Sequence, residues 1–150
     1  MEWYKIKLHL IGALQTNKVK LAVKLFDYIH SVDSEKLAKK ISDEQQKQNK
    51  KVKVFIQVNI GDEEQKSGVD KSSVLKLYSH CKDLGLNVIG LMCIPPLEKS
   101  SDFFFEKMRI WNENLNLNEL SMGMSSDYLD AVKNSATYLR IGSNIFGERS

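Results

Sequence analysis

Residues 86–94 read Leu-Asn-Val-Ile-Gly-Leu-Met-Cys-Ile, an almost continuous apolar run that Pro95 and Pro96 close with a stiff turn. The earlier segment 52–60 has valine or isoleucine at every second position. Continuous and alternating apolar runs of this length are typical of strands covered on both faces or on one. Between them, residues 70–82 space their apolar side chains three and four apart, as a helix does. The sequence therefore predicts a strand–helix–strand unit in the middle of the chain.

The same alternation of strand and helix patterns extends to both ends of the chain. We expect strands at 6–11, 29–32, 52–60, 86–94, 120–124 and 138–142, and helices at 17–26, 33–47, 70–82, 100–115 and 126–134. Short links between the elements favour a parallel sheet built from right-handed crossovers. No composition shift or low-complexity segment interrupts the pattern, so we expect residues 1–150 to form a single α/β domain.

Two α/β architectures agree with this pattern. One is an open, doubly wound sheet, and the other is part of a (β/α)8 TIM-type barrel, which usually takes about 250 residues. The sequence lacks the Gly-x-Gly-x-x-Gly turn of dinucleotide-binding folds and lacks a P-loop. Periodicity and composition alone leave both architectures open.

Composition excludes several classes of protein. Hydrophobic residues make up 42% and charged residues 27% of the 150 residues, which excludes wholesale disorder. The net charge of +3 is too small to indicate nucleic acid binding, and no apolar window is long enough for a membrane span. Residues 1–7 alternate charged and apolar side chains too quickly for a signal peptide. We therefore expect a cytoplasmic protein that binds neither nucleic acid nor membrane.

Metal sites are not expected either. Cys81 and Cys93 lie far from any paired metal-ligand spacing, and we expect them to be small buried apolar residues. The acidic run at 62–64 is expected to be solvated.

Candidate ligand-binding residues lie at the carboxyl ends of the expected strands, where parallel α/β folds bind their ligands. The last two strand ends carry Ser125, Arg140, Gly142 and Ser143. Hydroxyls and backbone N–H groups in such positions suit a phosphate dianion. Structural roles stay open: a helix cap for Ser125, a turn for Gly142, a salt bridge for Arg140 and a core position for His9. No serine, histidine and acid have the spacing of a nucleophilic triad, so we name no catalytic residue.

Residues 9–18, His-Leu-Ile-Gly-Ala-Leu-Gln-Thr-Asn-Lys, resemble the motif His-x-Ile-Gly-x-Leu-Gln-x-Asn-Lys of the pyridoxal phosphate homeostasis proteins. These proteins are single-domain relatives of the alanine racemase barrel. Further stretches match the family in the same order along the chain: 30–33, 57–60 with 66–68, 90–95, 120–127 and 140–147. The resemblance covers essentially the whole chain.

The resemblance implies a (β/α)8 TIM-type barrel, alanine racemase N-terminal-like, that holds pyridoxal 5′-phosphate. Arg140 resembles the arginine that donates to the pyridine nitrogen and keeps it unprotonated. An unprotonated ring is a poor electron sink, which favours holding or handing over the cofactor above carbanion chemistry. The other cofactor-binding positions that the resemblance implies are Gly142 and Ser143 in one phosphate loop, Ser125 with Met124 in the other, and Asn59 and His9 near the ring.

One feature of the family has no match in this sequence. In the family, two strand–helix units precede the His9 motif, and the first strand carries the lysine that bonds covalently to the cofactor. We therefore expect the chain to correspond to strands three to eight, about six of the eight units. Open sheet edges would then favour self-association, and cofactor binding would be weak and reversible.

The function that follows from the resemblance is binding of pyridoxal phosphate in intracellular homeostasis of that cofactor. We expect no catalytic turnover by this chain. Apoenzymes that require pyridoxal phosphate (PLP) are the expected recipients of the cofactor. The alternatives are a remnant of a PLP-dependent racemase-like or other phosphate-ligand barrel enzyme, and a degraded reading frame without activity.

Overall fold

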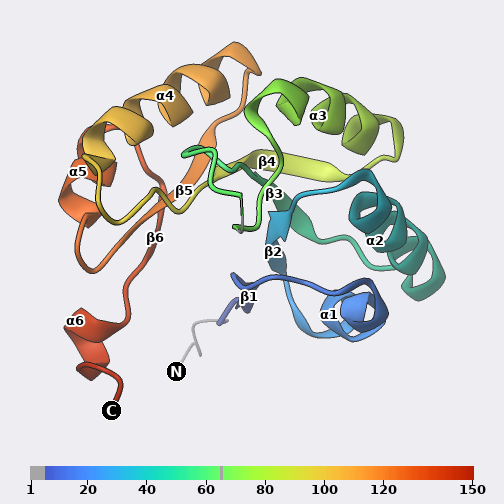
Figure 1. The fold of residues 1–150 in the computed structure, drawn as a ribbon. Coiled ribbons are helices and arrows are strands. Elements are labelled where there is room, and N and C mark those ends of the chain that lie inside the picture. The colour runs from blue at the N-terminus through green and yellow to red at the C-terminus, as the bar shows by residue number, and fades with distance from the viewer. Residues whose placement is uncertain (1–5, 65) are drawn as a thin grey trace.

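A computed structural model describes residues 6–64 and 66–150 of the chain. Its six strands form one sheet in the order β1-β2-β3-β4-β5-β6, and each strand is parallel to the next. They are β1 (His9–Leu10), β2 (Tyr28–Val32), β3 (Lys53–Gln57), β4 (Asn87–Met92), β5 (Glu119–Met124) and β6 (Tyr138–Arg140). A doubly wound sheet reverses its strand order, whereas a barrel keeps it, so the fold is part of a TIM-type barrel. Figure 1 shows the strands in an arc with helices along its outer side.

The five expected helices are present, with shifted ends. They are α1 (Val19–Leu25), α2 (Glu35–Gln48), α3 (Val74–Asp83), α4 (Ser101–Asn114) and α5 (Tyr128–Lys133), and a short unexpected helix, α6 (Ser143–Phe146), follows β6. The ends of α2 have clear causes. The Ser34 hydroxyl accepts from the Leu37 N–H at 3.1 Å, and Asn49 ends the helix in the left-handed conformation, with φ of 47°.

The apolar core lies between the outer side of the arc and the helices. Val54 and Ile56 of β3 are fully buried there, in one cluster with Leu37 and Ile41 of α2. The alternation read from residues 52–60 is thus the helix-facing side of a strand. Burial of these side chains is the main stabilising contribution to the fold.

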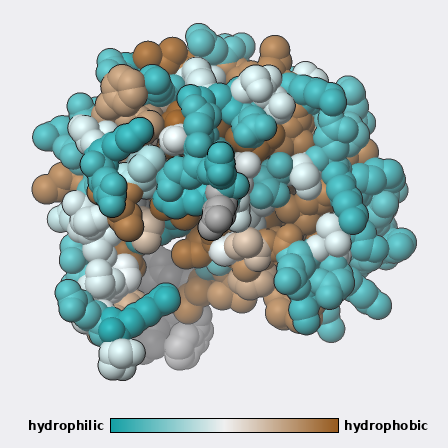
Figure 2. All heavy atoms as spheres, viewed as in Figure 1, coloured by the Kyte–Doolittle hydropathy of each residue, from teal (hydrophilic) through white to brown (hydrophobic). Residues whose placement is uncertain are grey.

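The concave side of the same strands is lined by aromatic and polar residues. His30 of β2 is 1% exposed and stacks on Phe55 of β3, with ring centroids 4.3 Å apart. His9 of β1 stacks on Tyr28 at 4.0 Å, and Tyr138 of β6 contacts both Tyr28 and Phe55. Figure 2 shows hydrophobic residues around the hollow on this side and hydrophilic residues over the outer helices.

Four strands are shorter than expected, among them the strand expected at 86–94, which spans Asn87–Met92. The strand expected at 6–11 is only His9–Leu10, which pairs with β2 on one side. The strand expected at 52–60 ends at Gln57, because the chain then turns into a loop that Val58 and Val69 close with an isolated bridge. The strand expected at 138–142 ends at Arg140, and Gly142 already precedes α6.

Several smaller expectations can be compared with the structure. No helix among the described residues is long and apolar enough to cross a membrane. Cys81 and Cys93 are buried and unpaired, as expected, and burial raises the pKa of each thiol to about 12. The acidic run is not simply solvated, because Asp62 pairs with Lys71 and Glu63 pairs with Lys66. Residues 1–5, part of the segment that argued against a signal peptide, lie outside the described residues.

Candidate functional site

The largest described cavity, of about 810 Å³, lies at the carboxyl ends of β5 and β6, with His9 of β1 at its edge. Six of the seven predicted site residues line it: His9, Met124, Ser125, Arg140, Gly142 and Ser143. The seventh, Asn59, lines a separate cavity of about 310 Å³ together with Gln57 and Lys66. Ile11, Ile94, Leu139 and Phe146 give the larger cavity its apolar surface. The structure thus brings together residues that lie more than 130 positions apart.

Arg140, at the end of β6, is held by two neutral acceptors. Its Nη1 donates to the Ser121 hydroxyl at 2.7 Å, and its Nη2 donates to the Cys93 carbonyl at 2.8 Å. No carboxylate of the described residues lies within ion-pair distance of this guanidinium, so the structural salt bridge considered above is absent there. Burial lowers the pKa of Arg140, although the charge of Asp127 opposes this, and no carboxylate of the described residues pairs directly with the guanidinium. Its remaining N–H groups can donate to a ligand.

A chain of hydrogen bonds runs from Arg140 across the concave face to β1. The Ser121 hydroxyl lies 2.8 Å from Nδ1 of His30, and Nε2 of His30 lies 2.9 Å from Nδ1 of His9. These contacts connect β6, β5, β2 and β1. They therefore tie the position of the guanidinium to the opposite end of the sheet.

The donor and the acceptor in each of these hydrogen bonds can be assigned by counting the donors and acceptors of the four side chains. Because Ser121 accepts from Arg140, its own proton is available for Nδ1 of His30, which must then accept. His30 in turn carries its proton on Nε2 and donates to His9, an assignment that leaves every group in the chain satisfied. Burial, and then the positive charges of His9 and Arg140, lower the pKa of His30 to about 3. Burial also lowers the pKa of His9, although Asp27 opposes this. His30 is therefore neutral at physiological pH.

Ser125 joins the last two loops of the chain. Its hydroxyl accepts from the N–H groups of Gly142 at 3.4 Å and Asn144 at 3.2 Å, and its carbonyl accepts from the Asn144 side chain. The hydroxyl of Ser125 therefore does not cap α5, the helix that follows it, but binds N–H groups at the beginning of α6. The Ser143 hydroxyl is exposed and has no protein partner within the described residues. Together these loops present hydroxyls and backbone N–H groups to the cavity.

The turn that carries Ser125 depends on two neighbouring residues. Gly123 has φ of 101°, and a Cβ atom at this position would lie 2.7 Å from the Ala131 Cβ, so only glycine suits it. Asp127 falls within the helix expected at 126–134, but it precedes α5 and accepts from the Met124 N–H at 2.8 Å. The carboxylate thus fixes the turn rather than the helix.

The side chain of Asn59 is already engaged. Its Nδ2 donates to the Glu63 carbonyl at 2.8 Å, and its Oδ1 accepts from the Glu63 N–H at 3.1 Å. In this structure Asn59 closes the loop after β3, next to the main cavity.

Sequence reasoning missed two residues that complete the site. His30 and Ser121 lie in the family-like stretches 30–33 and 120–127 and were not assigned to the site, although both lie on the concave face and contact other site residues. The signal was available: both are polar residues at inward positions of otherwise apolar strands. The hydrogen bond between them could not be predicted, because 91 residues separate them in the sequence.

Comparison with known proteins gives consistent matches over nearly the whole chain. The sequence model of the family "Alanine racemase, N-terminal domain" matches residues 3–150. A pyridoxal phosphate homeostasis protein of Aquifex aeolicus is 41% identical over 159 residues, which cover 99% of this chain and 68% of that protein. One of Haemophilus influenzae is 35% identical and is covered to 66%, with 100% of this chain aligned. The chain thus spans about two thirds of the length of these curated relatives.

Solved structures agree with these sequence matches. PipY of Synechococcus elongatus PCC7942, solved with PLP bound, superimposes with a TM-score of 0.89 at 34% identity. The superposition covers 95% of this chain and 71% of PipY. The same protein without PLP gives a TM-score of 0.87.

Proposed function

The chain belongs to the alanine racemase N-terminal domain family, among its pyridoxal phosphate homeostasis proteins, and we propose that it binds pyridoxal 5′-phosphate as part of the handling of that cofactor in the cell. The observation that carries this proposal is Arg140. A half-buried guanidinium held by neutral acceptors, without a carboxylate in the described residues, faces a cavity that also contains phosphate-type donors. The PLP-bound structure of PipY, which superimposes closely, supports the same ligand.

The residues of the cavity suit this cofactor. Its volume of about 810 Å³ lies within the range of about 300–1,000 Å³ that small-molecule sites usually have. The exposed hydroxyl of Ser143 and the proton of the Ser125 hydroxyl can donate to the phosphate group, while the Gly142 N–H, which donates to Ser125, holds the two loops together. Ile94, Leu139 and Met124 offer apolar surface for the ring. His9 of β1 also lines the cavity, and Asn59 closes the neighbouring loop after β3.

Arg140 would set the electronic state of the ring. A guanidinium has only N–H donors and cannot accept a proton, so it holds the pyridine nitrogen as an acceptor. When bound, pyridoxal phosphate supplies an aldehyde that condenses with amines and a ring that withdraws electrons. Ser121 and the Cys93 carbonyl fix the guanidinium, and neutral His30 fixes Ser121. These residues bind and orient the ring and move no proton.

The proposed role is accordingly storage and transfer without catalytic turnover by this chain. Among the described residues that line the cavity, His9 is the only one able to exchange a proton near neutral pH, and burial lowers its pKa. We propose a single partial barrel domain that acts in the cytoplasm and hands the cofactor to PLP-requiring apoenzymes. Exposed apolar residues near the cavity, such as Ile145 and Phe146, together with the outer edges of β1 and β6, would support self-association.

The proposal is tested by titrating the chain with pyridoxal 5′-phosphate and following its absorbance and binding heat. We expect saturable binding that dialysis reverses. Arg140→Ala should weaken the affinity at least about tenfold because a charge-assisted hydrogen bond is lost, and Ser143→Ala about threefold to tenfold. Pyridoxal, which lacks the phosphate, should bind more weakly than its phosphate ester and should not distinguish wild type from Ser143→Ala.

Lys36→Ala is the matched control, since Lys36 is exposed on α2 and lines no described cavity. Equal affinities of wild type, Arg140→Ala and Ser143→Ala would contradict the site, and absence of binding to the wild type would favour a degraded protein. Racemisation of alanine by the chain with added cofactor, abolished by Arg140→Ala, would instead favour the racemase-like alternative.

A further inference from the structure

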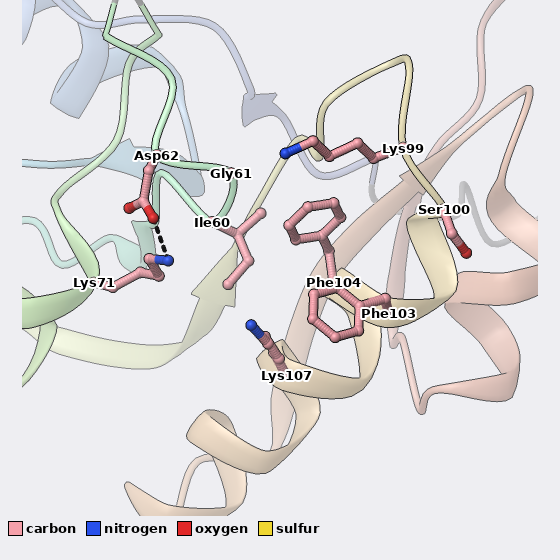
Figure 3. Close-up of a pocket in the computed structure, with 9 residues that line it drawn as sticks. All are labelled: Ile60, Gly61, Asp62, Lys71, Lys99, Ser100, Phe103, Phe104 and Lys107. Carbon is pink, nitrogen blue, oxygen red and sulfur yellow. Dashed lines mark ion pairs between the residues drawn. The ribbon is translucent and has the colours of Figure 1, made fainter.

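A third cavity lies between the loop that follows β3 and the beginning of α4. Its volume is about 270 Å³, and it shares no lining residue with the cofactor cavity. The residues that define it are Ile60, Asp62 and Lys71 from the loop side, and Lys99, Phe103 and Lys107 from the α4 side. Figure 3 shows the two groups facing one another.

The charge of this cavity is unbalanced. Lys71 forms an ion pair with Asp62, which neutralises both. Lys99 and Lys107 have no carboxylate partner within the described residues, and both line the cavity. In Figure 3 they extend from the α4 side toward the loop, on either side of the phenylalanine rings. Two ammonium groups without a carboxylate partner among the described residues thus border one small space from opposite sides of the phenylalanine rings.

The beginning of α4 adds to this positive potential. The helix runs for 14 residues from Ser101, and the side chain of its N-cap residue, Ser100, forms no capping hydrogen bond. The first backbone N–H groups of a helix of this length carry a partial positive charge, which the first-turn carboxylate of Asp102 offsets in part. Ser100 also lines the cavity, so this potential acts where the two lysines act.

The cavity also has apolar surface. Ile60 and Phe104 are buried below it, whereas Phe103 is 53% exposed. The ammonium of Lys107 lies 4.2 Å from the centroid of the Phe103 ring, which holds the lysine and the ring together by a cation–π contact. A ligand that covers Phe103 would remove exposed aromatic surface from water.

The loop side of the cavity is held firmly in place. A Cβ atom at Gly61 would lie 2.3 Å from Pro96, so the loop packs directly on the turn that closes β4. The two hydrogen bonds between Asn59 and Glu63 close the same loop. A binding site between α4 and this loop is therefore formed before any ligand arrives.

We propose that this cavity binds a small phosphate monoester with an apolar or aromatic body. A dianion matches the two unpaired ammonium groups, and the apolar body matches Phe103 and Ile60. The paired Asp62 and Lys71 form a neutral wall that admits the ligand without repelling it. This site is independent of the proposed cofactor site.

Phenyl phosphate is the probe that tests the proposal, in a titration of the ¹⁵N-labelled chain followed by amide chemical shifts. Saturable shifts are expected at residues 60–62 and 100–107. Inorganic phosphate should bind about tenfold more weakly, and neutral benzyl alcohol should give no saturable shifts there. Because the readout resolves position, binding at residues 142–147 of the cofactor cavity is distinguished from binding here.

Variants separate the contributions of charge and ring. Lys99→Ala and Lys107→Ala should each weaken phenyl phosphate about threefold to tenfold, and the double variant should abolish the shifts at 60–62. Phe103→Ala should weaken phenyl phosphate but not inorganic phosphate, and Lys36→Ala should change neither. Shifts confined to 142–147, a response that never saturates, or a double variant that binds like the wild type would each overturn the proposal.

Discussion

The two faces of the sheet are built from different kinds of residues, although they share the same strands. On β5, Met122 is fully buried among apolar side chains under the helices, while its neighbour Ser121 is equally buried on the concave side and hydrogen bonds to His30 and Arg140. The helix-facing side contributes burial, and the concave side contributes a polar chain that orients one guanidinium. Alternation along a strand thus lets neighbouring residues serve stability and binding separately.

The largest expected effect lies on the helix-facing side. Met122→Ala should lower the free energy of unfolding by about 2–5 kcal/mol, because the space vacated in a close-packed core is only partly refilled. Urea denaturation of the chain measures this. Leu97→Ala, at a position that is 93% exposed, is the control and should change stability by less than about 0.5 kcal/mol. A Met122→Ala chain as stable as wild type would show that this side is not the core.

The next effect comes from the concave side and depends on pH. The folded-state pKa of His30 is about 3, below the 6.5 of an exposed histidine, so the unfolded chain takes up a proton that the folded chain does not. The contribution of His30 to stability is therefore complete above pH 6.5 and falls as the pH drops toward 3, by about 3 kcal/mol at pH 4. Urea denaturation between pH 8 and pH 4 measures the slope.

His30→Gln is the comparison that isolates this contribution. Glutamine keeps hydrogen-bonding groups but does not titrate, so the slope between pH 6.5 and 4 should become shallower by the share of His30. Identical slopes in the two proteins would mean that His30 takes up its proton at the same pH in the folded and in the unfolded chain.

The smallest effect on stability separates the two faces most sharply. Ser121→Ala should cost about 1–2 kcal/mol, because it leaves a donor of Arg140 and Nδ1 of His30 without a partner. It should also weaken pyridoxal phosphate binding by more than Met122→Ala does under conditions where both variants remain folded. Calorimetric titration on the two folded variants provides the comparison, and equal affinities would remove the distinction between the faces.

Local patterns predicted most of the fold. The alternation in residues 52–60 gave both faces of β3, and the helix expected from residue 33 begins at Glu35, with Ser34 as its cap. Pro95 did not mark the end of its strand, because β4 already ends at Met92. The order of the strands was not readable from periodicity, because open and barrel sheets share the same local pattern. The resemblance of the motifs favoured the barrel, and the sequential strand order agrees with it.

The site was predicted at the level of residues but not of contacts. Arg140, Ser125 and Ser143 meet in one cavity because the ends of neighbouring parallel strands always meet at one edge. The bond from Arg140 to the Cys93 carbonyl could not be predicted, since every residue has a carbonyl and only the register of the strands selects one. The engagement of Asn59 by its own loop likewise depends on backbone geometry that no sequence pattern reveals.

The two buried thiols, Cys81 and Cys93, can be used to follow local unfolding of the chain. Arg140 uses the carbonyl of Cys93 and leaves the sulfur free of any binding role, and Cys81 lies on α3 in the apolar cluster. A thiol with a pKa near 12 is hardly ionised at neutral pH, and burial also keeps reagents away from it. Alkylation therefore requires the surrounding segment to unfold. Labelling rates at the two sulfurs, measured by mass spectrometry, would give the local unfolding rate of α3 separately from that of the segment after β4, which contacts the guanidinium. No engineered probe is needed.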